Sequence, residues 1–254
     1  MKKLLLLLVL VSFTALDTTA QDDLFGAQKL PARKGFIIGV NGNFDIPAAD
    51  MADRFGASYR IGGQVLYKLK SNWVVGPKVD FILGDRIRED SLMSNIRDEY
   101  GNFLNQDGEK MGVATFQRGY MIGLQVGKII NLSKTSSDNG ILVMTSVGFM
   151  QHKINIFDRD KTIPQLRGDY LKGYDRLTNG LFVEQFVGYT YFANNGLVNF
   201  NIGLDIAAGF TKLRRDYQYD LMRGDNSSRL DILFGIRGGW YIPIFKRKSE
   251  EFFF

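Results

Sequence analysis

The single histidine of this chain, His152, is the first candidate for chemistry. A histidine can act as a general base, and three nearby aspartates, Asp158, Asp160 and Asp169, could orient such a base. No serine stands out as the nucleophile that this arrangement would need. We therefore expect no catalytic residue, and we place His152 where an extended segment enters a long loop.

Acidic residues could also bind a metal ion. Those of Asp158-Arg159-Asp160 and of residues 88–90 are interleaved with arginines, and neither group has the spacing of a calcium-binding loop. We expect no metal and no cofactor. The chain also holds Arg-Gly-Asp triplets at 167–169 and 223–225. Such a triplet can be an adhesion ligand, but Gly-Asp is also common in ordinary turns.

The stretch 197–210 indicates which elements hold the side chains in place. From Val198 every second residue is apolar, and the residues between are asparagine, glycine, aspartate and alanine. Because side chains alternate across a strand, this pattern predicts one apolar face and one polar, closely packed face. By itself it fits a soluble sandwich, or a barrel wall with lipid outside.

Seven further segments alternate in the same way, with glycine and polar residues sharing one face. In 141–151 both faces carry apolar residues, and Ser146 and Gly148 indicate the inner one. The eight segments are 36–44, 59–69, 73–83, 118–130, 141–151, 181–192, 197–210 and 229–242.

The connections between these segments alternate in length. Three are short, at 70–72, 131–140 and 193–196, and four are long, at 45–58, 84–117, 152–180 and 212–228. An even number of antiparallel strands with this asymmetry is typical of a transmembrane barrel. The sequence therefore predicts an all-β fold, a closed antiparallel eight-stranded up-and-down barrel, with both chain ends in the periplasm.

Aromatic residues favour the two surfaces of a membrane, and their positions agree with this layout. Four are expected at the periplasmic ends of the strands: Tyr67, Trp73, Tyr191 and Trp240. Five others are expected near the outer ends: Tyr59, Phe81, Tyr120, Phe149 and Phe210.

The beginning of the chain resembles an export signal. Lys2 and Lys3 precede the apolar run Leu4 to Val11, and small residues follow up to Ala20. We expect 1–20 to be a cleaved signal peptide, 21–35 a periplasmic segment, 36–245 the barrel and 246–254 a periplasmic tail. The chain has no cysteine, and its net charge of +5 is spread along the sequence. Lipoprotein anchoring, disulfides and nucleic-acid binding are therefore not expected.

With these features the chain resembles the small eight-stranded outer-membrane barrels of bacteria, such as the OmpA transmembrane domain and the PorT-like barrels of Bacteroidota. The resemblance rests on the signal sequence, the eight alternating segments and the last strand, Leu230 to Phe245. It implies residence in the bacterial outer membrane and, for PorT-like barrels, a part in protein export or envelope assembly. Such barrels commonly end on an aromatic residue, which here is Phe245 or one of Phe252 to Phe254.

An eight-stranded barrel is so narrow that side chains fill it, and charges inside must pair. We expect a closed, salt-bridged lumen, with a gated ion path or a small-ligand pocket as alternatives. Asp205 should need a cationic partner such as Arg237. The residues expected inside are Arg60, Gln64, Lys68, Lys78, Asp80, Gln125, Glu184, Asp205, Asp231 and Arg237.

The long loops are the best candidates for binding partners. In 84–117, residues from Asp90 or Ser91 to Leu104 have apolar side chains at helical spacing. We expect a short helix there, and contacts through Ile96, Tyr100, Tyr170, Leu171 and Tyr174, although both loops could simply fold over the barrel mouth. The sequence thus predicts a non-enzymatic barrel that binds outer-membrane lipid and protein partners. A lipid-modifying enzyme that uses His152, or a small-solute pore, is the alternative.

Overall fold

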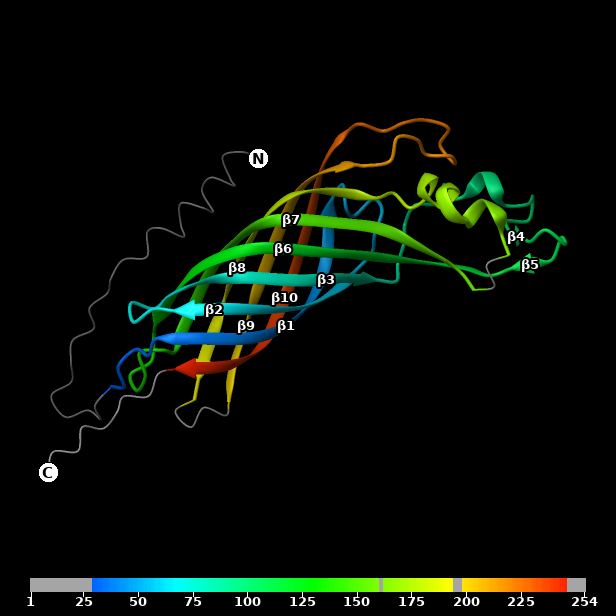
Figure 1. The fold of residues 1–254 in the computed structure, drawn as a ribbon. Coiled ribbons are helices and arrows are strands. Elements are labelled where there is room, and N and C mark those ends of the chain that lie inside the picture. Colours follow the sequence, from blue (N-terminus) through cyan, green and yellow to red (C-terminus); the bar gives the residue numbers. More distant parts are fainter. Residues whose placement is uncertain (1–28, 160–161, 194–197, 246–254) are drawn as a thin grey trace, which may run out of the picture.

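Eight long antiparallel strands form a closed barrel in the computed structural model, which describes residues 29–159, 162–193 and 198–245 (Figure 1). The expected signal peptide, the expected tail and the Asn-Gly of 193–196 lie outside these residues. The barrel strands are β1 (Gly35–Ala49), β2 (Ser58–Lys68), β3 (Trp73–Gly84), β6 (Val113–Asn131), β7 (Gly140–Asp158), β8 (Thr178–Phe192), β9 (Asn199–Leu213) and β10 (Ser228–Phe245).

Each of these strands pairs with its neighbours in the chain, and β1 pairs with β10 to close the barrel. The predicted up-and-down fold is confirmed. The register is staggered: followed pair by pair once around the barrel, Gly39 leads back to Ala49 on the same strand. Such a stagger tilts the strands against the barrel axis by roughly 35–45°.

The barrel wall separates apolar from polar side chains, as the alternation predicts. Large apolar residues on all eight strands are exposed on the outside, among them Val40, Ile61, Leu124, Leu204 and Ile236. The intervening residues are buried inside. A continuous apolar outer surface of this kind is stable only against lipid.

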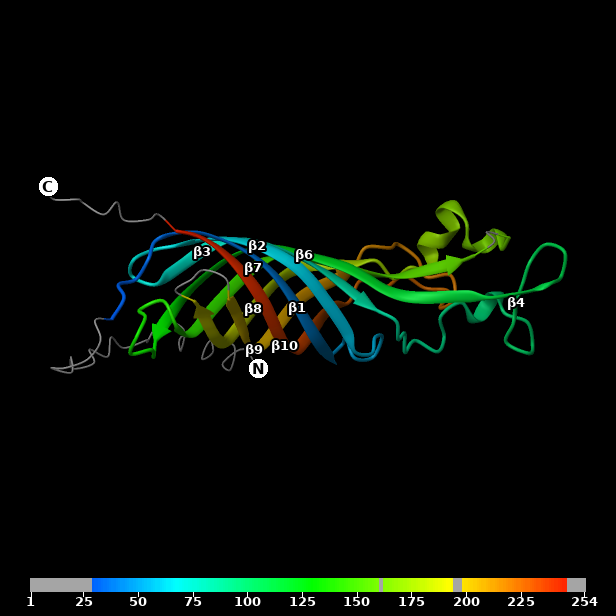
Figure 2. The same cartoon turned by 90° about the horizontal axis from the view of Figure 1, so that it is seen from below.

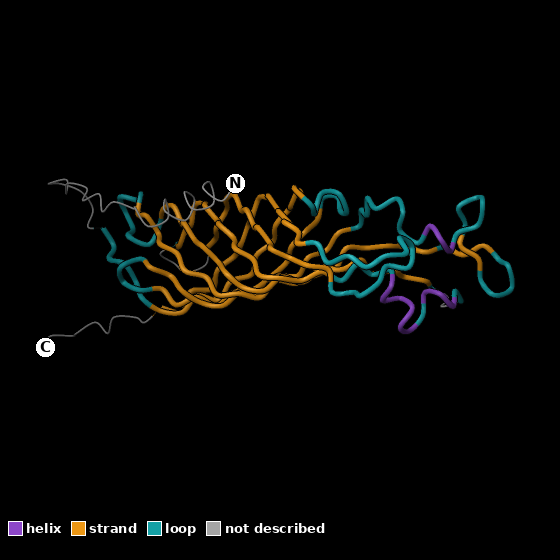
Figure 3. Tube along the Cα trace, turned by 90° about the horizontal axis from the view of Figure 1, so that it is seen from above, coloured by secondary structure: helices purple, strands orange, loops and turns teal. Residues whose placement is uncertain are grey.

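The strands reach farther at the loop end than the sequence suggests. The loops shrink to 50–57, 85–112, 159–177 and 214–227. Beyond the pairs Gln117–Gly84 and His152–Thr178, β6 and β7 pair only with each other and form a two-stranded ribbon outside the barrel (Figures 2 and 3). The expected boundaries were wrong here because strand residues above the membrane no longer alternate between lipid and lumen.

The predicted helix within 84–117 is also wrong. This loop holds only the 3-10 turn η1 (Ser94–Ile96) and a small hairpin of β4 (Phe103–Leu104) and β5 (Lys110–Met111). Asp98 accepts hydrogen bonds from the backbone N–H groups of Tyr100 and Asn102, at 3.0 and 2.7 Å. An aspartate that binds nearby backbone in this way favours a turn over a helix.

The remaining loop elements are the 3-10 helices η2 (Pro164–Leu166) and η3 (Gly168–Gly173). Within the described residues, no helix is long and apolar enough to cross a membrane.

Candidate functional site

Arg60 is the centre of the charge network inside the barrel. It projects from β2 and is fully buried. Its Nε lies 2.6 Å from Asp45 Oδ2 on β1, and its Nη1 lies 2.7 Å from Glu184 Oε1 on β8. Its Nη2 pairs with Asp205 on β9. In the strand order β8 lies opposite β2, so the Arg60 side chain crosses the lumen.

Lys78, on β3, makes a second crossing. Its ammonium group binds Glu184 and lies 2.7 Å from Asp80 Oδ2. Asp80 also accepts a hydrogen bond of 2.9 Å from the Asn41 amide. Nearly every charge in this network therefore has an opposite charge at contact distance, which a buried charge needs.

The expected pairing of Asp205 with Arg237 is secondary. Arg237 Nη1 lies 3.9 Å from Asp205 Oδ2, whereas Arg60 makes a direct hydrogen bond to the other carboxylate oxygen. Arg237 also donates to Gln64 Oε1 at 3.1 Å, and its guanidinium lies over the Phe186 ring. Gln125 donates to the same Gln64 oxygen at 2.7 Å. Asp205 thus pairs mainly with Arg60 across the lumen, and only secondarily with Arg237 on the neighbouring strand.

Glycines on the inner face make room for these large side chains. A Cβ on Gly62 would lie 1.9 Å from Asp80 Oδ1, and one on Gly39 would lie 2.8 Å from the Tyr241 ring. Because glycine has no side chain, the lumen beside it has room for the arginine, tyrosine and phenylalanine side chains that project from other strands. This explains why glycine accompanies the polar residues in the alternating segments.

His152 and Asp231 form a separate cluster nearer the loops. The expected position of His152 was wrong: it lies within β7, and its buried ring points inward, with Nε2 2.8 Å from Asp231 Oδ2. Thr211 donates to the same oxygen at 2.6 Å, and Arg54 Nη2 lies 3.0 Å from Asp231 Oδ1. Asp231 therefore does not belong to the Arg60 network.

The His152 ring is held by Asp231 and lies beside a threonine hydroxyl rather than a serine hydroxyl. In the described part of the chain, no serine hydroxyl is hydrogen-bonded to the His152 ring. The ring faces the lumen rather than the lipid. Arg54 comes from the short loop after β1 and was missed because nothing in its local sequence indicates that it folds back into the barrel.

A third group of polar residues closes the periplasmic end. Lys68 Nζ lies 2.7 Å from Asp138 Oδ1 and 2.7 Å from Asn72 Oδ1. Arg33 Nε lies 2.6 Å from the other Asp138 oxygen. Lys68 is thus buried, as expected, but it holds the periplasmic turns together instead of joining the central network.

The four aromatic residues expected at the periplasmic end do face outward. Tyr67 packs edge-on against Phe36, with ring centroids 5.0 Å apart, and Tyr191 packs against Phe200 at 5.6 Å. Lys128 lies over the Trp73 ring. Trp240 is exposed on β10. Such a ring of outward-facing aromatic side chains is typical of the position where a barrel crosses the surface of the membrane.

The extracellular loops are packed together by their own apolar core. This core joins Met51, Phe55, Leu92, Phe103 and Tyr174 of the loops to residues inside the upper barrel, such as Met121, Met150 and Leu233. The loops therefore cover the mouth and fill it from above.

Buried Arg176 ties three loops to one another. Its Nε lies 2.6 Å from Glu89 Oε1, and its Nη2 lies 2.7 Å from Asp220 Oδ2. Asp220 also accepts the Met93 backbone N–H at 3.0 Å. Because these groups come from distant parts of the sequence, no local pattern indicates this anchor.

A cluster of tyrosines lies above this anchor. Tyr219 contacts Tyr170, Tyr174 and Tyr217, with ring centroids 6.4, 5.7 and 6.0 Å apart. Tyr170 is 65% exposed and Tyr217 is exposed, whereas Tyr174 is buried beneath them, where burial raises its pKa. We call Tyr170, Tyr174, Tyr217 and Tyr219 the tyrosine cluster.

Of the five expected loop contacts, some are exposed and others are buried. Tyr170 and Tyr100 are open to solvent, and Tyr100 is 79% exposed near the β4–β5 hairpin. Tyr174 is buried, and Ile96 and Leu171 are partly buried against the loop core, so these three offer less surface to a partner than Tyr100 and Tyr170 do. Tyr217 and Tyr219 were missed, although their spacing along the last loop is a recognisable signal.

No protein-family model matches this chain, and no curated protein matches it. Several solved structures are similar. Ail of Yersinia pestis, in complex with the heparin analogue sucrose octasulfate, has a TM-score of 0.45 and 11% identity, over 82% of this chain and 98% of Ail. Neisserial surface protein A has a TM-score of 0.46 and 7% identity, over 82% and 97% of the two chains.

The outer membrane protein OprG of Pseudomonas aeruginosa has a TM-score of 0.39 and 14% identity, over 85% of this chain and 99% of OprG. The strand register of this chain closes the barrel by itself.

Proposed function

We propose that this protein is a non-enzymatic outer-membrane barrel that binds a protein partner through its extracellular loops, as an accessory subunit of an envelope complex. The observation that supports this best is the tyrosine cluster, which presents Tyr170 and Tyr217 on a packed base. Tyrosine provides a large, rigid contact surface and is enriched in protein interfaces. Loops that only sealed the barrel would not need to expose these rings.

The packed base makes such a surface effective. The Arg176 ion pairs and the apolar core hold the exposed rings in place before a partner arrives. A surface ordered in advance loses less conformational entropy on binding. The same loops fill the mouth, so the binding role and the closed lumen have a common structural basis.

The kind of complex follows only from resemblance. PorT-like barrels of Bacteroidota suggest a part in protein export or envelope assembly, and this is an analogy at the level of the fold. The regions 21–35 and 246–254 are the further candidates for periplasmic contacts, by their position in the sequence.

Site-specific photo-crosslinking in the native outer membrane tests the proposal. A photoreactive residue is placed at Tyr170, at Tyr100, or at Leu181, which is 69% exposed on the lipid face. We expect a discrete protein adduct from Tyr170 or Tyr100, and none from the lipid-facing control. Absence of protein adducts at both loop positions would contradict a partner-binding role.

Two measurements separate the alternatives. Because Arg60 and Lys78 cross the lumen, the purified protein should give no stable conductance in a planar bilayer. A lipid-modifying enzyme would show an acylation or hydrolysis activity that disappears in His152→Ala. A stable channel, or an activity of this kind, would replace the proposed function.

A further inference from the structure

A pair of cations lies on the outer wall of the barrel, near its extracellular end. Arg118 on β6 and Lys153 on β7 are register partners, and both belong to the outward-facing positions of their strands. Most other outward positions carry apolar side chains. Two neighbouring positive charges there would be costly unless they lie above the hydrocarbon and meet an anion.

Neither cation has a carboxylate partner within the part of the chain that the structure describes. Arg118 Nη1 donates to the backbone carbonyls of Gly84 and Gln117, at 3.2 and 2.7 Å, and the guanidinium lies 4.9 Å from the Phe116 ring. These contacts orient Arg118 without pairing its charge. The ion pairs of the described residues include neither Arg118 nor Lys153.

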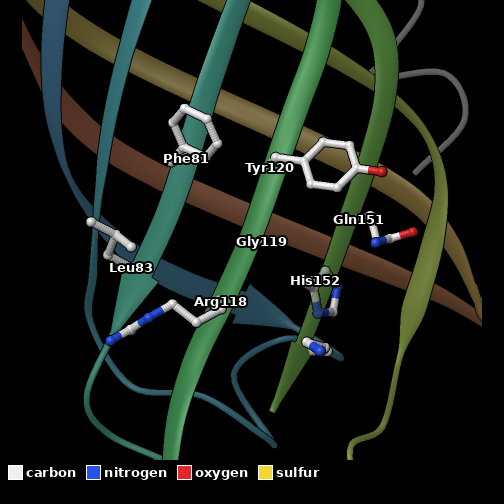
Figure 4. A pocket seen from close by; sticks show the side chains of 8 residues that line it. Phe81, Leu83, Arg118, Gly119, Tyr120, Gln151 and His152 are labelled. Atoms are coloured by element: carbon white, nitrogen blue, oxygen red, sulfur yellow. The ribbon is translucent and has the colours of Figure 1, made fainter. Parts of the chain in front are cut away.

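An apolar groove runs from these cations along the wall. It is lined by Phe81, Leu83, Arg118, Tyr120, Gln151 and Lys153, together with the backbone of Gly119 and His152. In Figure 4, Phe81, Tyr120 and Gln151 lie toward one end of the groove, and Arg118 lies farther along its strand. The Tyr120 ring also approaches Phe149, with centroids 6.4 Å apart.

Along the strands toward the loops, aromatic residues are followed by cations, just as the acyl chains of a lipid are followed by its headgroup. Phe81, Tyr120 and Phe149 are aromatic residues of the kind that mark the membrane surface. Arg118 follows two residues beyond Tyr120 toward the loops, which corresponds to about 7 Å along a strand. The cations are therefore at the height of the headgroups, as is Leu83, the register partner of Arg118. Phe81 and Tyr120, which are also register partners, lie closer to the acyl chains.

We propose that Arg118 and Lys153 bind the phosphate group of an outer-leaflet glycolipid, whose acyl chain lies along Phe81 and Tyr120. An arginine oriented by backbone carbonyls, beside a lysine, suits a phosphate because both supply charged hydrogen-bond donors. The Gln151 amide, beside Tyr120 in the register, can donate to a sugar or phosphate oxygen. This inference rests on the outer-membrane position of the proposed function, but not on a protein partner.

The test is lipid binding by the purified barrel in detergent, measured by native mass spectrometry. The probes are bis-phosphorylated lipid A, its dephosphorylated form and inorganic phosphate. Arg118→Gln combined with Lys153→Gln removes both charges. Lys212→Gln is the matched control, because Lys212 also faces outward, two residues beyond an outer aromatic residue, Phe210, but on β9. Heat-modifiable mobility on gels verifies that all variants fold.

We expect the double variant to bind phosphorylated lipid A roughly thirtyfold more weakly than the wild type, since each of the two basic residues contributes on the order of 1 kcal/mol near a membrane surface and about 1.4 kcal/mol is tenfold. The Lys212→Gln control should bind normally, and the dephosphorylated lipid should bind weakly to all forms. Equal binding by the double variant would overturn the proposal, as would equal binding of dephosphorylated lipid. Displacement by millimolar phosphate alone would show a free-anion site and also overturn it. None of these results depends on the crosslinking at Tyr170, so the two proposals can fail separately.

Discussion

Arg60 Nη1 on β2 lies 2.7 Å from Glu184 Oε1 on β8, the strand on the opposite side of the barrel. This one contact joins residues that are 124 positions apart in sequence. Both side chains are buried, and each has further partners of opposite charge. At this level the lumen is therefore closed by a bridge between opposite walls.

Replacing Arg60 should destabilise the barrel strongly. Arg60→Met leaves Asp45 and Asp205 buried without their main partner, and breaking a buried pair in this way costs about 3–5 kcal/mol. We expect a lower urea midpoint for loss of heat-modifiable mobility. Lys172→Met is the control, because its ion pair with Asp169 is exposed and should contribute little. Equal midpoints for the two variants would contradict a structural role for the network.

The close packing of glycines between β8 and β9 predicts that alanine is tolerated at some glycine positions of the barrel and not at others. Gly203 faces Gly188 on the neighbouring strand, and a Cβ on Gly203 would lie 2.3 Å from the Gly188 Cα and 2.3 Å from the Val187 carbonyl oxygen. Gly203→Ala should therefore shift backbone and lower the yield of folded barrel. Gly42→Ala is the matched control, since nothing lies within 4 Å of its Cβ position. Folding into lipid vesicles, followed by gel mobility, measures both; similar yields would show that the wall adapts.

Loss of the Arg176 anchor should loosen the loops but leave the barrel folded. Arg176→Gln removes the ion pairs with Glu89 and Asp220 and leaves two carboxylates close to each other. We expect limited proteolysis to cut the loops at least several-fold faster, with an unchanged barrel fragment. Arg214→Gln, which loses only an exposed hydrogen bond to Asn179, should behave like the wild type. Unchanged cleavage in Arg176→Gln would mean that the apolar core alone orders the loops.

Asp225 should respond to pH in a defined direction. Burial raises the pKa of this loop carboxylate, but hydrogen bonds from Ser227 and the nearby Arg229 outweigh burial and hold the pKa at about 2. Since an unfolded aspartate titrates near pKa ~3.9, the contribution of Asp225 to loop stability is present above that pH. It is lost as the pH falls through about 2.

Carbon-13 NMR of labelled aspartate carboxylates measures this titration. In Arg229→Gln the Asp225 pKa should rise toward its ordinary value, because one hydrogen bond and one opposite charge are removed. An Asp225 resonance that titrates identically in both proteins would show that Arg229 has no part in the low pKa.

Sequence patterns were sufficient for the barrel because its two environments impose a strict alternation. Leu204 and Ile236 face lipid, and Asn201 and Asp205 face the lumen, as their parity predicts. The patterns became unreliable above the membrane. There Thr115 and Ile156 pair on a ribbon with no lipid on one side and no lumen on the other, so the alternation no longer marks where the strands end.

The helix expected around Leu92 and Ile96 failed for a related reason. Helical spacing describes which residues could share a face, but local hydrogen bonds of Asp98 compete with the helix, and Phe103 is drawn into a core made by other loops. Tyr174 is buried by the same core, although the mixture of aromatic and charged residues around it in the sequence is typical of an exposed contact segment.

The sequence by itself determined the class of fold and which residues enter the lumen, because alternation between lipid and a narrow interior is encoded residue by residue. Only the tertiary structure decided which charges pair, since ion pairs such as Arg60–Glu184 and Arg54–Asp231 join residues on distant segments. It also decided that Arg118 and Lys153 lie side by side on the outer wall, because register between strands, which no single segment contains, brings them together.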